Sequence, residues 1–84
     1  GDVRFEPVSA LVADDLGLSD IRTIVSEVHA YLKPDGWLLL EHGFDQGSAV
    51  RQIMLQAGFS EVTTYTDLAG LDRVSACRNS DLGI

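Results

Sequence analysis

The chain has 84 residues, which suffices for one small domain with a modest hydrophobic core. Hydrophobic residues make up 45% of it and charged residues 23%, a balance that excludes a disordered chain. A net charge of −7, with only 6 Lys and Arg, excludes a basic surface for nucleic acid, and no apolar run is long enough to cross a membrane. The single cysteine, Cys77, cannot form an internal disulfide and is typical of a cytoplasmic protein.

Residues 1–18 are expected to be irregular: residues 1–12 should be extended, because Pro7 disfavours a helix, and residues 13–18 should form an acidic, glycine-containing turn. Ser19 is suited to cap a helix that runs to about Leu32, since apolar residues recur there at spacings of three and four. Pro34 and Gly36 would end this helix and form a turn.

The next segment, Trp37–His42, is the most informative one. Its first four residues are all apolar, as in a strand that is buried on both faces of a parallel α/β sheet. In such sheets ligands bind beyond the carboxyl ends of the strands. The residues that follow the apolar run are therefore candidates for a site.

A second helix is expected from Asp45, as its cap, to Ala57, with Gly58 in the left-handed position that closes it. The β-branched and aromatic segment 62–66 predicts a strand, and a loop should join it to a last strand at 73–78 in an antiparallel hairpin.

The predicted order of helix, strand, helix, strand and strand makes only part of a sheet. The first strand–helix–strand unit should be a right-handed parallel crossover. The strand at 37–42 would keep at least one bare apolar edge, which folded proteins normally cover. We therefore expect a piece of a longer protein that self-associates when isolated. Residues 79–84 are expected to fray.

Several segments carry a resemblance to a known family. They are Gly1–Pro7 with Ala10–Val12, the turn and strand Leu32–Glu41, Leu40–Gly43 with Gln46–Gly47 and Val50–Arg51, and Ala57–Phe59. Together they resemble the C-terminal part of the HemK/PrmC family, the protein-(glutamine-N5) methyltransferases that act on peptide chain release factors. The resemblance implies an α/β fold, namely the C-terminal half of a class I S-adenosylmethionine-dependent methyltransferase sheet with Rossmann-like order. Residues 1–84 would then belong to the catalytic domain.

The resemblance also implies what this chain lacks. The family's glycine-rich cofactor loop follows its first strand, and its Asn-Pro-Pro-Tyr substrate motif follows its fourth; neither occurs here. No catalytic or cofactor-binding residue is therefore carried over. The intact enzyme would use S-adenosylmethionine and a release factor, whereas the fragment alone should bind no cofactor and be inactive. Without a cysteine pair or neighbouring histidines, no metal site is expected.

Five residues are candidates for the substrate side of the site. Glu41 and His42 would lie at the carboxyl tip of their strand, where Glu41 would accept hydrogen bonds and His42 would line the site; alternatively, both only cap the strand and hold the next loop. Arg4, Phe5 and Glu6 would border the glutamine pocket or dock the protein substrate; alternatively, Phe5 plugs the core and the other two form a solvated pair.

The residues leave two other functions open. One is a free-standing acidic α/β interaction module without catalysis. The other is a class I methyltransferase that acts on a small molecule or a nucleic acid, although the net charge of −7 weighs against nucleic acid.

Overall fold

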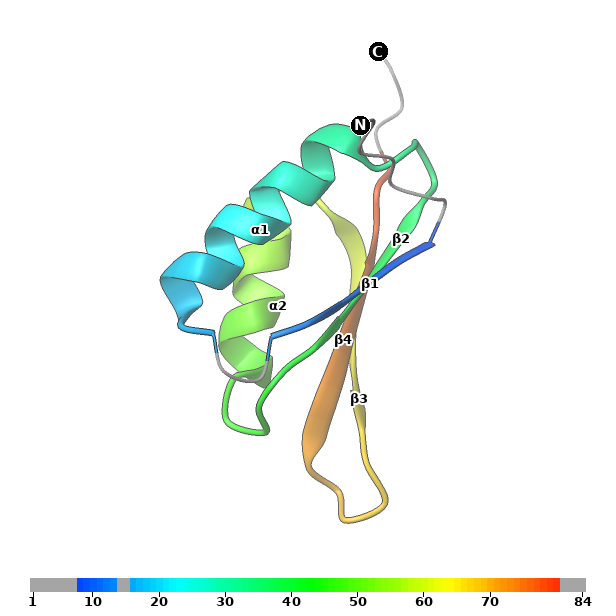
Figure 1. The fold of residues 1–84 in the computed structure, drawn as a ribbon. Helices are drawn as coiled ribbons and strands as arrows, with labels where there is room; N and C mark the ends of the chain where they lie inside the picture. Colours follow the sequence, from blue (N-terminus) through cyan, green and yellow to red (C-terminus); the bar gives the residue numbers. More distant parts are fainter. Residues whose placement is uncertain (1–7, 14–15, 81–84) are drawn as a thin grey trace.

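The computed structural model describes residues 8–13 and 16–80, which form a four-stranded sheet with two helices on one of its faces (Figure 1). The elements in chain order are β1 (Val8–Val12), α1 (Leu18–Tyr31), β2 (Trp37–Glu41), α2 (Gly47–Gln56), β3 (Ser60–Thr66) and β4 (Asp72–Arg78). The predicted α/β class is confirmed. None of the helices in these ranges is long and apolar enough to span a bilayer.

The sheet is mixed, with the strand order β1-β2-β4-β3. β1 runs parallel to β2, and β4 runs antiparallel to both β2 and β3. The predicted antiparallel last strand and its hairpin with β3 are therefore confirmed. β2 and β3 run in the same direction but are not neighbours, because β4 lies between them.

Strand β1 was not foreseen, and the expectation that 1–18 is irregular is wrong for this segment. Val8 lies opposite Trp37 and Val12 opposite Glu41, and the amide of Ala13 extends the pairing by donating to the carbonyl of Glu41 at 2.7 Å. The expected bare edge of β2 is also wrong, because β1 and β4 cover both of its edges. Residues 1–7 and 14–15 lie outside the described part of the chain.

The hydrophobic core lies between the sheet and the two helices. It is built from the inward faces of all these elements, chiefly Ile21, Val25, Val28, Leu38, Leu40, Val50, Ile53, Met54, Phe59 and Cys77. On β2, the buried Leu38 and Leu40 face the helices, whereas Trp37 and Leu39 are half-buried on the opposite face. No described helix covers that opposite face (Figure 1).

Both helices begin without a side-chain cap, so the two predicted caps are wrong. α1 starts after Gly17, and Ser19 lies inside its first turn. α2 starts after Gln46 and not after Asp45. The side chain of Gln46 explains its position: its Oε1 accepts from the amide of Gly43 at 2.9 Å, and its Nε2 donates to the carbonyl of Leu16 at 2.9 Å. Such contacts between distant segments are not visible in a local pattern.

The predicted end of α2 is confirmed. Gly58 has a φ of 100°, the left-handed conformation that glycine adopts without strain. The amide of Phe59 donates to the carbonyl of Met54 and that of Gly58 to the carbonyl of Leu55, both at 3.1 Å. This is the Schellman pattern, and it returns Phe59 to the core beside Met54.

Asn79 is buried, so the frayed tail predicted for 79–84 does not begin there. Its Nδ2 donates to the carbonyl of Leu32 at 2.7 Å, and its amide donates to the carbonyl of Gly36 at 2.8 Å. Its own carbonyl accepts from the amide of Asp35 at 2.6 Å. Asn79 thus ties the end of α1 to the turn before β2, and residues 81–84 lie outside the described ranges.

Candidate functional site

The parallel strands β1 and β2 end at the same edge of the sheet, the edge at which α/β proteins bind ligands. Glu41 ends β2 and His42 follows it, so two of the five predicted site residues lie at this edge. Arg4, Phe5 and Glu6 lie outside the described residues, and their roles stay predictions.

Glu41 is exposed on the sheet face that no described helix covers. Its carboxylate has no hydrogen-bond or ion-pair partner among residues 8–13 and 16–80. It lies on the rim of an apolar groove of about 220 Å³, which is lined by Ala10, Leu11, Val12, Leu39, Glu41 and Val74. This groove is smaller than ligand pockets, which measure roughly 300 to 1,000 Å³. Glu41 can therefore accept a hydrogen bond from an approaching group, but the groove alone does not enclose a cofactor.

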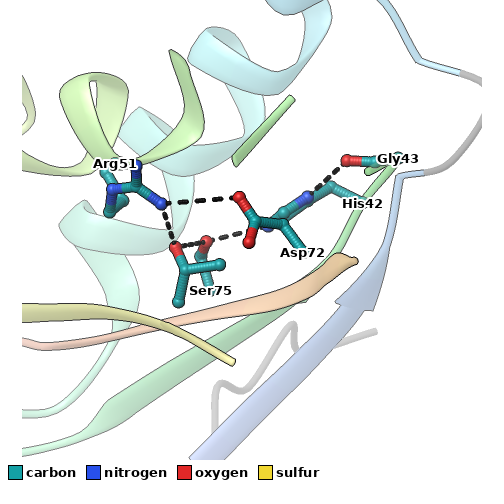
Figure 2. A network of polar contacts seen from close by, with 6 residues as sticks. His42, Gly43, Arg51, Asp72 and Ser75 are labelled. Carbon is teal, nitrogen blue, oxygen red and sulfur yellow. Dashed lines mark hydrogen bonds and ion pairs between the residues drawn. The ribbon is translucent and has the colours of Figure 1, made fainter. Parts of the chain in front are cut away.

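His42 is fully buried and faces the helical layer. Its Nε2 lies 2.8 Å from Ser75 Oγ, and its Nδ1 lies 2.9 Å from the carbonyl oxygen of Gly43 (Figure 2). The ring therefore holds the start of the loop between β2 and α2. In this structure His42 positions that loop from behind the carboxyl edge of the sheet, and both of its ring nitrogens contact other groups of the fold.

A chain of polar contacts continues from Ser75 to the surface (Figure 2). Ser75 Oγ lies 2.7 Å from Thr64 Oγ1, which accepts from Nη1 of Arg51 at 2.7 Å. The same Nη1 lies 3.9 Å from a carboxylate oxygen of Asp72. These polar contacts thus join β2, β3, β4 and α2 on the helical side of the sheet.

Donor and acceptor chemistry fixes which group donates in each hydrogen bond of this series. The carbonyl of Gly43 can only accept, so Nδ1 of His42 carries the proton and donates it. With a neutral ring, Nε2 accepts from the hydroxyl of Ser75, whose oxygen accepts from the hydroxyl of Thr64, whose oxygen accepts from Arg51. Every group is then satisfied.

Asp72 also shields the beginning of α2. A Cβ on Gly47, the first residue of the helix, would clash with the carboxylate of Asp72, so only glycine permits this close approach. A carboxylate at this position also interacts favourably with the positive end of the helix dipole. The loop 43–47 therefore presents no open cradle for an anion, although it contains two glycines.

The remaining reactive groups offer no further chemistry at this edge. Burial raises the pKa of Cys77 to about 12, so its thiol stays protonated and is a core residue, as its place in the sequence indicates. Across the part of the chain that the structure describes, no group of three or more metal-ligating side chains comes together.

Sequence reasoning did not find Ser75, Thr64 and Arg51. One signal was present: Ser75 occupies an inward position of β4, two residues before the buried Cys77, where an apolar residue is the norm. Its partners depend on the register, which places Ser75 opposite Leu40 on one side and Thr64 on the other. No local pattern predicts that pairing.

Comparison with known proteins identifies relatives. No protein-family model matches the chain. The release factor glutamine methyltransferase of Pseudomonas aeruginosa is 56% identical over 75 residues, which are 89% of this chain and 27% of the relative. The enzyme of the same name from Vibrio cholerae is 55% identical over 75 residues, 89% of this chain and 26% of the relative. That from Salmonella typhimurium is 50% identical over 78 residues, 93% of this chain and 28% of the relative.

The chain spans only about a quarter of the length of these curated relatives. Identity of this extent along nearly the whole chain establishes common descent. The chain therefore belongs to the family of the release factor glutamine methyltransferases, the family that its sequence resembles.

Proposed function

We propose that this chain is the C-terminal portion of an S-adenosylmethionine-dependent methyltransferase that methylates the N5 atom of a glutamine side chain in a peptide chain release factor. The observation that carries the proposal is the 50–56% identity to curated relatives of that name over about nine tenths of the chain. Residues 1–84 would form the outer part of the catalytic domain, in a cytoplasmic enzyme without direct nucleic-acid or membrane contacts.

The geometry is compatible with the outer half of a class I, Rossmann-like sheet. β1 and β2 are parallel, and β4 inserts antiparallel beside β2. Parallel sheets are normally covered on both faces, yet the half-buried Trp37 and Leu39 face a side without described helices. The rest of a longer protein would cover this face and complete the cleft at the carboxyl edge.

The described residues do not fit S-adenosylmethionine by themselves. The carboxyl edge supplies the exposed carboxylate of Glu41, that of Asp45 in the loop that follows β2, and a groove of about 220 Å³. The beginning of α2, which follows the same edge, is closed by Asp72. We therefore infer that the chain alone neither binds the cofactor nor transfers a methyl group.

The chemistry of the proposed reaction assigns the chain a supporting role. An amide nitrogen is a weak nucleophile because its lone pair is delocalised, whereas a sulfonium methyl group is already electrophilic. Catalysis then depends on in-line positioning and on acceptors for the amide hydrogens. Glu41 would offer such an acceptor at the edge, and His42 would position the neighbouring loop through Gly43 and Ser75.

A chimera tests the proposal. This chain replaces the matching stretch of the Pseudomonas aeruginosa relative, and methyl transfer to a release factor is measured with labelled cofactor. We expect an active chimera, no activity from the 84-residue chain alone, and no heat of binding when that chain is titrated with S-adenosylmethionine. A folded chimera that is inactive would contradict the assignment. Activity or cofactor binding by the chain alone would contradict its supporting role.

One observation favours the alternative of a free-standing interaction module: β1 closes the edge of β2, so the chain builds its own four-stranded sheet and core. The chimera separates the two functions, since a module of unrelated role would not restore methyl transfer. Methylation of a small molecule or nucleic acid, and not of the release factor, would instead support a methyltransferase with another substrate.

A further inference from the structure

Exposed apolar side chains gather at one end of the sheet. Nine large hydrophobic side chains are exposed within residues 8–13 and 16–80, and six of them lie at the carboxyl edge of β1 and β2. These six are Val12, Leu18, Phe44, Tyr65, Leu68 and Leu71, whereas Val8, Tyr31 and Leu55 lie elsewhere. Single exposed apolar residues need no explanation, but several close together favour an interaction surface, and three of the six share one hairpin, β3–β4.

The β3–β4 hairpin is the part of this surface that projects farthest from the rest of the sheet (Figure 1). Glu41 ends β2 opposite Val74, so the first residues of β4 and the loop 67–71 extend beyond the end of β2. Leu68 lies in that loop and is fully exposed, and it is flanked by Tyr65, which is 59% exposed, and Leu71, which is 39% exposed. The most exposed apolar side chain thus stands at the tip of the most prominent projection.

This tip is a structured loop. Asp67 Oδ1 accepts from the amides of Ala69 at 2.8 Å and Leu71 at 3.0 Å, and its Oδ2 accepts from Nε of Arg73 at 3.0 Å. These donors, the Leu71 amide first and Arg73 next, lower the pKa of Asp67, so the carboxylate keeps them at neutral pH. A loop that is already held in one geometry loses less conformational freedom when it binds.

We propose that the hairpin tip, with Leu68 as its anchor, docks the protein substrate, an inference that rests on the proposed function. The tip lies at the carboxyl edge, where the glutamine would be methylated, but beyond the strand ends, where a small acceptor would not reach. Asp67 and Arg73 neutralise each other, so the tip is locally apolar in a chain of net charge −7. Such a tip fits an apolar recess of a folded protein next to the modified glutamine.

The test uses the full-length chimera with the Pseudomonas aeruginosa relative and compares Leu68→Ser with a matched control. Leu55→Ser removes an equally large exposed side chain, 53% exposed, from the other end of the molecule. Binding of the release factor is measured by calorimetry, and methylation of the whole factor is compared with methylation of a short glutamine peptide. We expect Leu68→Ser to weaken binding and raise KM for the whole factor about tenfold, with kcat and the peptide kinetics unchanged. The control should behave as the parent.

The outcomes separate this inference from the proposed function. If the parent chimera binds and methylates the release factor and Leu68→Ser does so equally well, the docking role is refuted and the function stands. If Leu68→Ser lowers the Tm of the chimera, the tip packs against the rest of the enzyme, which also refutes docking. If the parent chimera neither binds nor methylates the factor, the proposed function and the inference fall together.

Discussion

The series of buried hydrogen bonds around His42 predicts that the Ser75 hydroxyl contributes to the free energy of unfolding. In Ser75→Ala, the buried Nε2 of His42 loses its donor and the Thr64 hydroxyl loses its acceptor. A buried polar group left without its partner costs about 1 to 3 kcal/mol, and Thr64 retains its bond to Arg51, so we expect a loss of about 2 to 3 kcal/mol. For a domain of this size that corresponds to a fall in Tm of about 10 to 20 °C.

The measurement is equilibrium unfolding in urea, followed through the fluorescence of Trp37, the only tryptophan of the chain. Thr63→Ala removes an exposed hydroxyl from the neighbouring strand and should change stability by less than about 0.5 kcal/mol. Ser75→Thr keeps a hydroxyl and should recover part of the loss. Nitrogen-15 NMR of the His42 ring should show a proton on Nδ1 and none on Nε2.

If Ser75→Ala is no less stable than Thr63→Ala, the Ser75 hydroxyl contributes nothing to the buried hydrogen bonds and its stabilising role is refuted. A double-mutant cycle with His42→Phe adds a second check. Since the two side chains are in contact, the combined loss should be smaller than the sum of the single losses by about 1 kcal/mol. Strict additivity would show that the two groups act independently.

Three further predictions concern other parts of the fold. The pKa of Cys77 in the folded state, about 12, lies above the ordinary value of 9.0, so the protonated thiol favours the folded state. The free energy of unfolding should therefore be retained below pH 9 and fall above it, by at most about 1.4 kcal/mol per pH unit. Cys77→Ala should abolish this slope when urea unfolding is measured as a function of pH. Asp35 has a φ of 66°, so Asp35→Gly should be more stable than Asp35→Ala by about 1 kcal/mol in the same assay, and equal stability would contradict the strain. The isolated chain should self-associate through its uncovered sheet face; sedimentation at high concentration should show dimers or larger species that Leu39→Glu disperses, and a strict monomer would exclude this.

Local patterns determined most elements of this chain. The apolar run at 37–40 marked β2, the spacing of apolar residues marked α1, and Gly58 marked the end of α2. These features depend on neighbours within a few residues, such as side-chain periodicity and the left-handed turn of glycine, so they are readable without the fold. The family resemblance likewise followed from short motifs.

Tertiary structure alone decided what pairs with what. β1 is a strand because β2 offers it an edge, and its own five residues carry only a weak pattern. The start of α2 is set by Gln46, which contacts Leu16 across the molecule, and Ser75 meets His42 only through the register of β4 on β2. Hydrogen bonds between distant segments depend on the whole packing, which is why the polar chain and the apolar carboxyl edge were not predictable from local sequence.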